Sequence, residues 1–80
     1  MPRYHLHLSN RLGPVRDDEG KELPDLEAAR AEAVASIRSV LSDEVRQGRL
    51  DLKGEVAITD GDDQVQAVVA FADAIDLRLE

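Results

Sequence analysis

The chain contains no cysteine and no tryptophan, and Tyr4 and Phe71 are its only tyrosine and phenylalanine. Without cysteine, neither a disulfide framework nor a thiolate zinc site can form. The core of this 80-residue chain must therefore consist mainly of valine, leucine, isoleucine and alanine. A domain of this length buries only about 60–65% of its unfolded surface, so self-association would add stability.

Basic residues and long apolar runs are also scarce. Ten lysines and arginines stand against 17 acidic residues, which gives a net charge of −7. Nucleic acids require clustered basic residues, so we expect no nucleic-acid partner, whereas an acidic surface suits a basic protein partner. No apolar run approaches the roughly 20 residues that span a bilayer, and the first ten residues lack the features of a signal peptide. We therefore expect a cytoplasmic protein with no membrane partner.

The first part of the chain predicts short strands. Residues 3–9 alternate between apolar and polar side chains, which is typical of a half-buried strand. Gly13-Pro14 then interrupts the pattern with a turn. Residues 15–16 and 22–23 are predicted to form the arms of a short, weak hairpin, with residues 18–20 at its tip.

A long helix is predicted next. Pro24 disfavours helical geometry in the residue before it, and Asp25 is a good N-cap. Nothing interrupts the helix up to Gln47, and Gly48 stands where a helix-terminating glycine is expected. The apolar residues recur at helical spacing and should pack on a sheet: Leu26, Ala29, Ala33, Ile37, Val40, Leu41 and Val45.

The last part of the chain predicts a β-hairpin. Residues 54–60 and 65–71 read as antiparallel strands joined by a tight turn that begins with Asp60-Gly61. Residues 72–75 fit one helical turn, after which Leu77 and Leu79 alternate as a strand or pack singly. The predicted fold is a single α+β domain over residues 1–80. It consists of a small antiparallel sheet (strand, weak hairpin, helix, strand, strand) packed on one long helix.

The lengths of these elements predict a homodimer. The helix would be about 33 Å long and strands of six residues roughly 20 Å, so the helix extends beyond its sheet. The strand over residues 65–71 is apolar on both faces, which leaves one face without a cover in the monomer. We expect the contact between two copies to include this strand or the far half of the helix, at Val65, Val68, Val69, Leu41 and Val45.

His5 and His7 are the candidate metal ligands. On a strand they lie on the same face, with about 7 Å between their alpha carbons. Two imidazoles supply half of a zinc or nickel site, but a third ligand is required. The carboxylates are abundant, and none lies at a sequence distance from the histidines that marks it as this ligand. We therefore expect neither a metal nor a cofactor. His5 and His7 are then polar side chains that face solvent or lie beside a contact between subunits.

The carboxylates of Asp17, Asp18 and Glu19 are the candidates for acid–base chemistry or calcium binding. Twelve-residue calcium loops that begin at Asp17 or Asp60 lack the final bidentate glutamate. Paired catalytic carboxylates need a shaped pocket, for which so small a chain has little material. No nucleophile motif or phosphate-binding loop is present. We therefore expect a solvated hairpin tip and no enzymatic activity.

Four segments carry a resemblance to a known family: M-P-R-Y-H-L-H-L, D-D-E-G-K-E-L-P-D-L-E-A-A-R-A-E-A, E-V-A-I-T-D-G-D and F-A-D-A-I. Together they resemble a family of short alphaproteobacterial proteins of unknown function, over nearly the whole chain. This resemblance implies a single α+β domain and no known activity.

A weaker resemblance is to HicB-type antitoxins, in which two strands precede a P-D-L motif and an alanine-rich helix. Residues 23–26, L-P-D-L, match that motif in type. The chain lacks the glycine- and threonine-bearing segment that HicB proteins place before the helix, and it lacks a DNA-binding domain.

These observations predict a non-enzymatic protein-interaction or regulatory module. Two alternatives stay open. One is an antitoxin-like inhibitor of a basic RNA-cleaving partner, for which the acidic surface would be useful. The other is a small metal-binding protein that uses His5 and His7.

Overall fold

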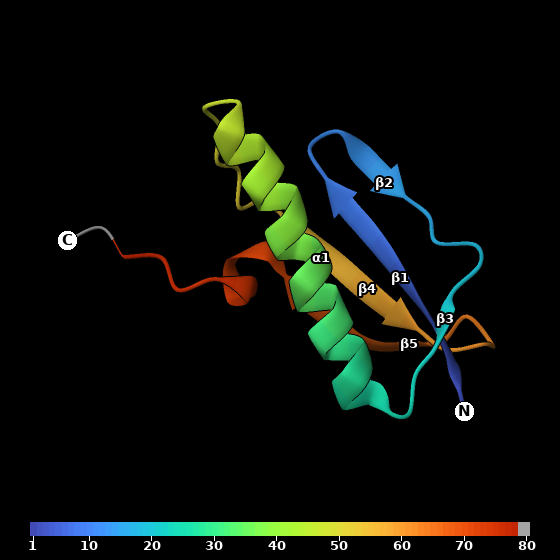
Figure 1. The fold of residues 1–80 in the computed structure, drawn as a ribbon. Coiled ribbons are helices and arrows are strands. Elements are labelled where there is room, and N and C mark those ends of the chain that lie inside the picture. The colour runs from blue at the N-terminus through green and yellow to red at the C-terminus, as the bar shows by residue number, and fades with distance from the viewer. Residues whose placement is uncertain (79–80) are drawn as a thin grey trace.

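A computed structural model describes residues 1–78, so the prediction for Leu79 lies outside the described residues. The described residues form five strands, one long α-helix and one short 3-10 helix (Figure 1). In chain order these are β1 (Arg3–Asn10), β2 (Gly13–Val15), β3 (Lys21–Glu22), α1 (Leu26–Arg46), β4 (Gly54–Thr59), β5 (Val65–Ala70) and η1 (Phe71–Ala74).

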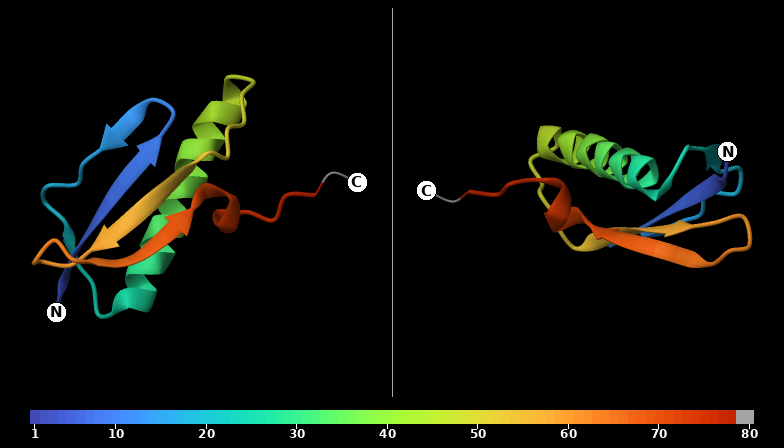
Figure 2. Two further views of the ribbon diagram at one scale, coloured as in Figure 1. Left: turned by 180° about the vertical axis from the view of Figure 1, so that it is seen from behind. Right: turned by 90° about the horizontal axis from the view of Figure 1, so that it is seen from below.

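The sheet is antiparallel, with the strand order β2-β1-β4-β5, and β3 pairs with β1 beside β2. Helix α1 crosses one face of the sheet, so the domain has two layers (Figure 2). The predicted α+β fold is therefore confirmed.

The pairing of the short strands differs from the expected hairpin. Residues 13–15 and 21–22 do not pair with each other; β2 pairs with residues 8–10 and β3 with residues 3–4. The tight turn lies at residues 11–12, between β1 and β2. The eight-residue β1 offers one long edge, and each of the two very short strands pairs with a different part of it.

Helix α1 begins and ends where its sequence indicates. Asp25 has extended backbone geometry, and its Oδ1 accepts a hydrogen bond from the N–H of Ala28 over 2.8 Å. At the other end, Gly48 has a φ of +81° and donates its N–H to the carbonyl of Val45 over 2.9 Å. Both predicted caps are confirmed.

The core lies between α1 and the sheet face that the helix covers. Buried alanines on α1 let the helix approach the sheet closely, and valine, isoleucine and phenylalanine side chains fill the space between the two layers. The fully or nearly buried apolar residues are Tyr4, Leu23, Ala29, Ala33, Ile37, Leu41, Val56, Ile58, Val69, Phe71 and Ala74.

The expected interaction residues divide into two groups. Val69 and Leu41 are buried in the core, since Val69 faces α1 and Leu41 faces the sheet. Val65, Val68 and Val45 are 62%, 49% and 56% exposed. Val65 and Val68 pair with Thr59 and Ala57 on the sheet face opposite α1, so this face has no helical cover (Figure 2).

Within residues 1–78 no helix is both long and apolar enough to cross a membrane.

Candidate functional site

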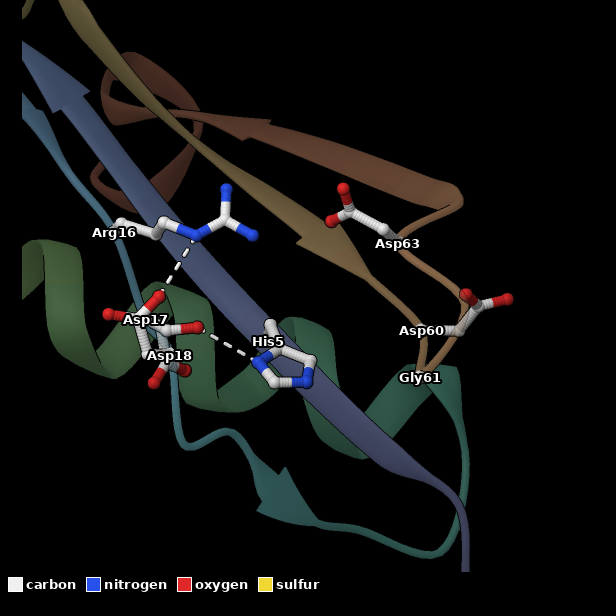
Figure 3. Close-up of a pocket in the computed structure, with 7 residues that line it drawn as sticks. All are labelled: His5, Arg16, Asp17, Asp18, Asp60, Gly61 and Asp63. Atoms are coloured by element: carbon white, nitrogen blue, oxygen red, sulfur yellow. Dashed lines mark hydrogen bonds and ion pairs between the residues drawn. The ribbon is translucent and has the colours of Figure 1, made fainter.

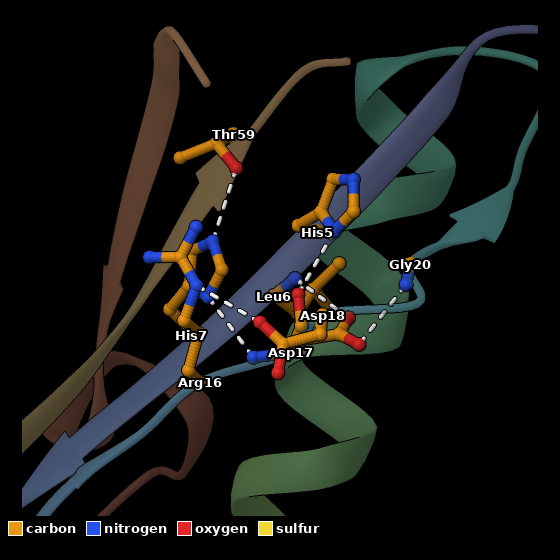
Figure 4. Close-up of polar contacts among 8 residues, drawn as sticks. All are labelled: His5, Leu6, His7, Arg16, Asp17, Asp18, Gly20 and Thr59. Carbon is orange, nitrogen blue, oxygen red and sulfur yellow. Dashed lines mark hydrogen bonds and ion pairs between the residues drawn. The ribbon is translucent and has the colours of Figure 1, made fainter. Parts of the chain in front are cut away.

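Asp17 fills a gap in the sheet beside β1. On the outer edge of β1, β3 pairs with residues 3–4 and β2 with residues 8–10, which leaves Leu6 without a strand partner on that edge. The N–H of Leu6 instead donates to Oδ2 of Asp17 over 3.1 Å (Figure 4). A side-chain carboxylate thus satisfies a backbone donor that a neighbouring strand would otherwise bond.

Two histidines hold the backbone of the same aspartate. Nδ1 of His5 lies 2.8 Å from the carbonyl oxygen of Asp17, and a carbonyl can only accept, so this nitrogen carries a proton. The N–H of Asp17 donates to Nδ1 of His7 over 3.0 Å, so that nitrogen carries none. Neutral His7 then has its proton on Nε2, which donates to Oγ1 of Thr59 over 3.2 Å. We call His5, His7, Asp17 and Thr59 the Asp17 clasp.

Gly20 closes the loop that carries Asp17. Its N–H donates to Oδ1 of Asp17 over 3.0 Å, and its φ is +71°. A Cβ at this position would lie 2.8 Å from the carbonyl oxygen of Tyr4 and 2.9 Å from the ring of His5. Only glycine fits both the backbone conformation and the space, which explains its place in the D-D-E-G segment.

The environment of Asp17 favours its ionised form. Burial raises the pKa of this carboxyl, but the hydrogen bonds from the N–H groups of Leu6 and Gly20 lower it, and the positive charge of the His5 and His7 rings, when these are protonated, lowers it further. The net effect is a pKa below the ordinary value of 3.8. Asp17 is therefore a partly buried acceptor that stays charged at neutral pH.

A shallow cavity of about 250 Å³ adjoins the clasp. It is lined by residues of two loops together with a histidine of β1 (Figure 3): His5, Arg16, Asp17, Asp18, Asp60, Gly61 and Asp63.

Most of its carboxylates have partners within their own loops. Asp18 accepts from Arg16 over 2.9 Å, and Oδ1 of Asp60 accepts from the N–H groups of Asp62 and Gln64. Among residues 1–78, no hydrogen bond is made by the Asp63 carboxylate, by the terminal nitrogens of Arg16 or by Nε2 of His5, which in the neutral ring is an acceptor.

The sequence led us to expect that the carboxylates over residues 17–19 are all solvated, and the structure shows that one of them is not. Asp18 and Glu19 are exposed, but Asp17 is partly buried and bonded through its carboxylate and its backbone. The spacing D-x-x-G, after an interrupted strand, was the available signal for this loop closure. This spacing does not show which strand forms hydrogen bonds with Asp17.

The two histidines lie on the expected face and adopt a parallel arrangement. Their ring centroids are 6.0 Å apart with an interplanar angle of 8°, so the two rings are stacked. Both nitrogens of His7 are used in the clasp. In the described part of the chain, no three histidine, cysteine or acidic side chains come together in a group suited to a metal ion.

A family model described as "Domain of unknown function (DUF6894)" matches residues 3–72, which include all five strands, α1 and the Asp17 clasp. The chain belongs to the DUF6894 family. No curated protein and no solved structure matches it. Membership of DUF6894 agrees with the expected resemblance to a family of unknown function. The description of the family names no activity. The likeness to HicB-type antitoxins stays a prediction.

Proposed function

We propose that this DUF6894 protein is a non-enzymatic protein-interaction module that works as a homodimer. The observation that carries the proposal is the exposure of valines on ordered elements. Val65 and Val68 project from β5 on the open sheet face, and Val45 projects from the last turns of α1. Exposed apolar side chains that cluster on regular elements are typical of contact surfaces.

The free edge of the sheet supports this proposal. Within the described chain β5 pairs with β4 alone and forms one edge of the sheet. Edge strands are normally protected by a charge or a proline that discourages pairing with another chain. On the opposite edge, β2 contains Pro14 and is followed by Arg16, whereas Val65–Ala70 contains neither a proline nor a charge.

The distribution of charge supports contact between identical copies. Two chains of net charge −7 repel each other unless they meet at surfaces poor in carboxylates. The strand β5 has no carboxylate, and the surface beside Val45 is bordered by Arg38 and Arg46. Both surfaces therefore suit a two-fold contact, in which the same patch is presented twice.

The Asp17 clasp supports a non-enzymatic role. Both carboxylate oxygens, the N–H and the carbonyl of Asp17 are bonded within the fold, as are both nitrogens of His7. A catalytic group must keep a reactive atom available to the substrate. Apart from Nε2 of His5, the imidazole nitrogens of the clasp and the polar atoms of Asp17 fasten the loop to β1.

The test is the mass of the protein in solution, measured by sedimentation and light scattering at micromolar concentration. We expect twice the 8.8 kDa of one chain. Val68→Lys and Val45→Lys should each be compared with Val15→Lys, a matched control at a valine that is 60% exposed on the opposite edge strand. A species of 8.8 kDa at every concentration, with a cooperative thermal transition independent of concentration, would exclude the dimer.

A further inference from the structure

The far end of α1 borders an apolar groove with an unusual charge. The cavity has a volume of about 430 Å³ and is lined by Arg38, Leu41, Ser42, Val45, Arg46, Leu50 and Ile75. Its charged residues are both arginines, although the chain has 17 acidic and ten basic residues. A partner for this groove would combine an apolar side chain with a carboxylate.

The two arginines keep donors available for such a partner. In residues 1–78, five basic side chains form ion pairs with carboxylates: Arg3, Arg11, Arg16, Lys21 and Arg78. Neither Arg38 nor Arg46 forms one in that part of the chain. Arg38 donates its Nε to the carbonyl of Ala74 over 2.7 Å, which holds η1 against the helix and leaves its two terminal nitrogens at the groove.

The chain after η1 carries the complementary groups. Ile75 lines the groove and has extended backbone angles, with a φ of −136° and a ψ of 159°. Asp76 and Leu77 follow, and Leu77 is 50% exposed. This segment leads away from the body of the domain (Figures 1 and 2).

Leu77 lies beyond the groove of its own chain. Ile75 lines the groove of its own chain, whereas Leu77 is not among the residues that line it. The segment leads away from the body of its own domain (Figures 1 and 2), so a second copy can present its groove to Leu77 without a change in the path of the chain.

We propose that Asp76 and Leu77 of one copy dock in the groove of a second copy, and that the second copy returns the same contact. Leu77 lies on the apolar floor beside Val45 and Leu50 of the other chain, and the Asp76 carboxylate faces the guanidinium groups of its Arg38 and Arg46. Asp76 gives up an exposed pair with Arg78 at 2.9 Å, and such pairs contribute little to stability. This inference rests on the proposed homodimer and names the surface that forms it.

The experiment combines a tail variant, a groove variant and a matched control. Leu77→Lys places a cation on the tail, opposite the arginines of the groove. Val45→Lys places a cation in the groove itself, near the C-terminus of α1, where a positive charge is compatible with the helix. The control, Leu12→Lys, makes the same change at a leucine that is 77% exposed in the turn between β1 and β2. We expect the first two to raise the dimer dissociation constant by at least about tenfold and the control to leave it unchanged. Circular dichroism verifies that each variant is folded.

Mixing the two defective variants provides a second readout. In an equimolar mixture, the intact tail of Val45→Lys meets the intact groove of Leu77→Lys, so one of the two contacts survives in the heterodimer. We expect the average mass of the mixture to exceed that of either variant alone at the same total concentration. A mixture that behaves as the average of its components would contradict a reciprocal exchange.

The outcomes separate this inference from the proposed function. A dimer that dissociates with Val68→Lys but persists with Leu77→Lys overturns the docked segment and leaves the homodimer standing. The docked segment is equally overturned if Leu77→Lys changes only the thermal stability of a dimer of unchanged affinity, as expected if the segment folds onto its own chain. An unmutated protein that stays at 8.8 kDa overturns both.

Discussion

The backbone N–H of Asp17 donates to Nδ1 of His7 over 3.0 Å, while the carbonyl of the same residue accepts a hydrogen bond from Nδ1 of His5 over 2.8 Å. One residue therefore gives two neighbouring imidazoles opposite roles at the same ring position. The loop before β3 is thereby fastened to β1 by backbone and side-chain bonds together. These bonds replace the strand pairing that β2 and β3 leave incomplete.

The first prediction concerns the positions of the ring protons. When both imidazole rings are neutral, His5 should hold its proton on Nδ1 and His7 on Nε2. A carbonyl oxygen faces Nδ1 of His5, whereas an N–H faces Nδ1 of His7. Long-range nitrogen–proton correlation spectra distinguish the two tautomers directly. A proton on Nδ1 of neutral His7 would contradict the clasp.

The elements that the sequence predicted are those determined by nearby residues. The alternation of residues 3–9 and the cap at Asp25 act over a few positions, and both appear in the structure. Strands of two or three residues have no such local signal, so the pairing of β2 and β3 with β1 depends on tertiary contacts. The same holds for Asp17, whose partner Leu6 lies 11 residues earlier.

Burial of the expected contact residues was harder to predict for a related reason. The run over residues 65–71 is apolar at almost every position, so its pattern does not show which side faces a helix. The register with β4 assigns Val69 to the core and Val68 to the open face. Leu41 and Val45 are one helical turn apart, yet Leu41 is buried in the core and Val45 is 56% exposed beside the apolar groove.

The second prediction is the effect of Asp17→Asn on stability. The amide has one acceptor where the carboxylate has two, so either Leu6 or Gly20 loses its partner. We expect the free energy of unfolding to fall by about 1–3 kcal/mol at neutral pH. Urea denaturation measures it, with Asp18→Asn as the control, because Asp18 is exposed and accepts only from Arg16.

The pH dependence of that difference follows from the lowered pKa of Asp17. A carboxyl with a lower pKa in the folded state contributes stability above its unfolded value, near 3.8, and loses it as the pH falls through the folded value. The difference between the parent protein and Asp17→Asn should therefore be constant at neutral pH and shrink below about pH 4. A difference that grows on acidification would be inconsistent with an ionised Asp17.

The third prediction compares two glycine substitutions. Gly20→Ala should lower the free energy of unfolding by more than about 1 kcal/mol, because φ is +71° and the added carbon meets the carbonyl of Tyr4. Gly61→Ala has open space around its Cβ and no positive φ, so its effect should stay within about 1 kcal/mol of zero. Chemical denaturation of both variants tests the loop, and equal effects would mean that Gly20 is not under this constraint.

The last prediction concerns the start of α1, where Asp25 accepts the N–H of Ala28 over 2.8 Å. Asp25→Ala removes the acceptor and leaves a helix-terminal donor to solvent, so the free energy of unfolding should fall by about 0.5–2 kcal/mol with the fold intact. Asp25→Asn keeps a side-chain oxygen and should restore most of the loss, whereas a purely electrostatic role would leave it as unstable as the alanine variant. Asp62→Ala is the control, since it removes the same charge from an exposed turn. Denaturation midpoints of the three variants decide the matter, and an unchanged midpoint for Asp25→Ala would show that this cap does not stabilise the helix.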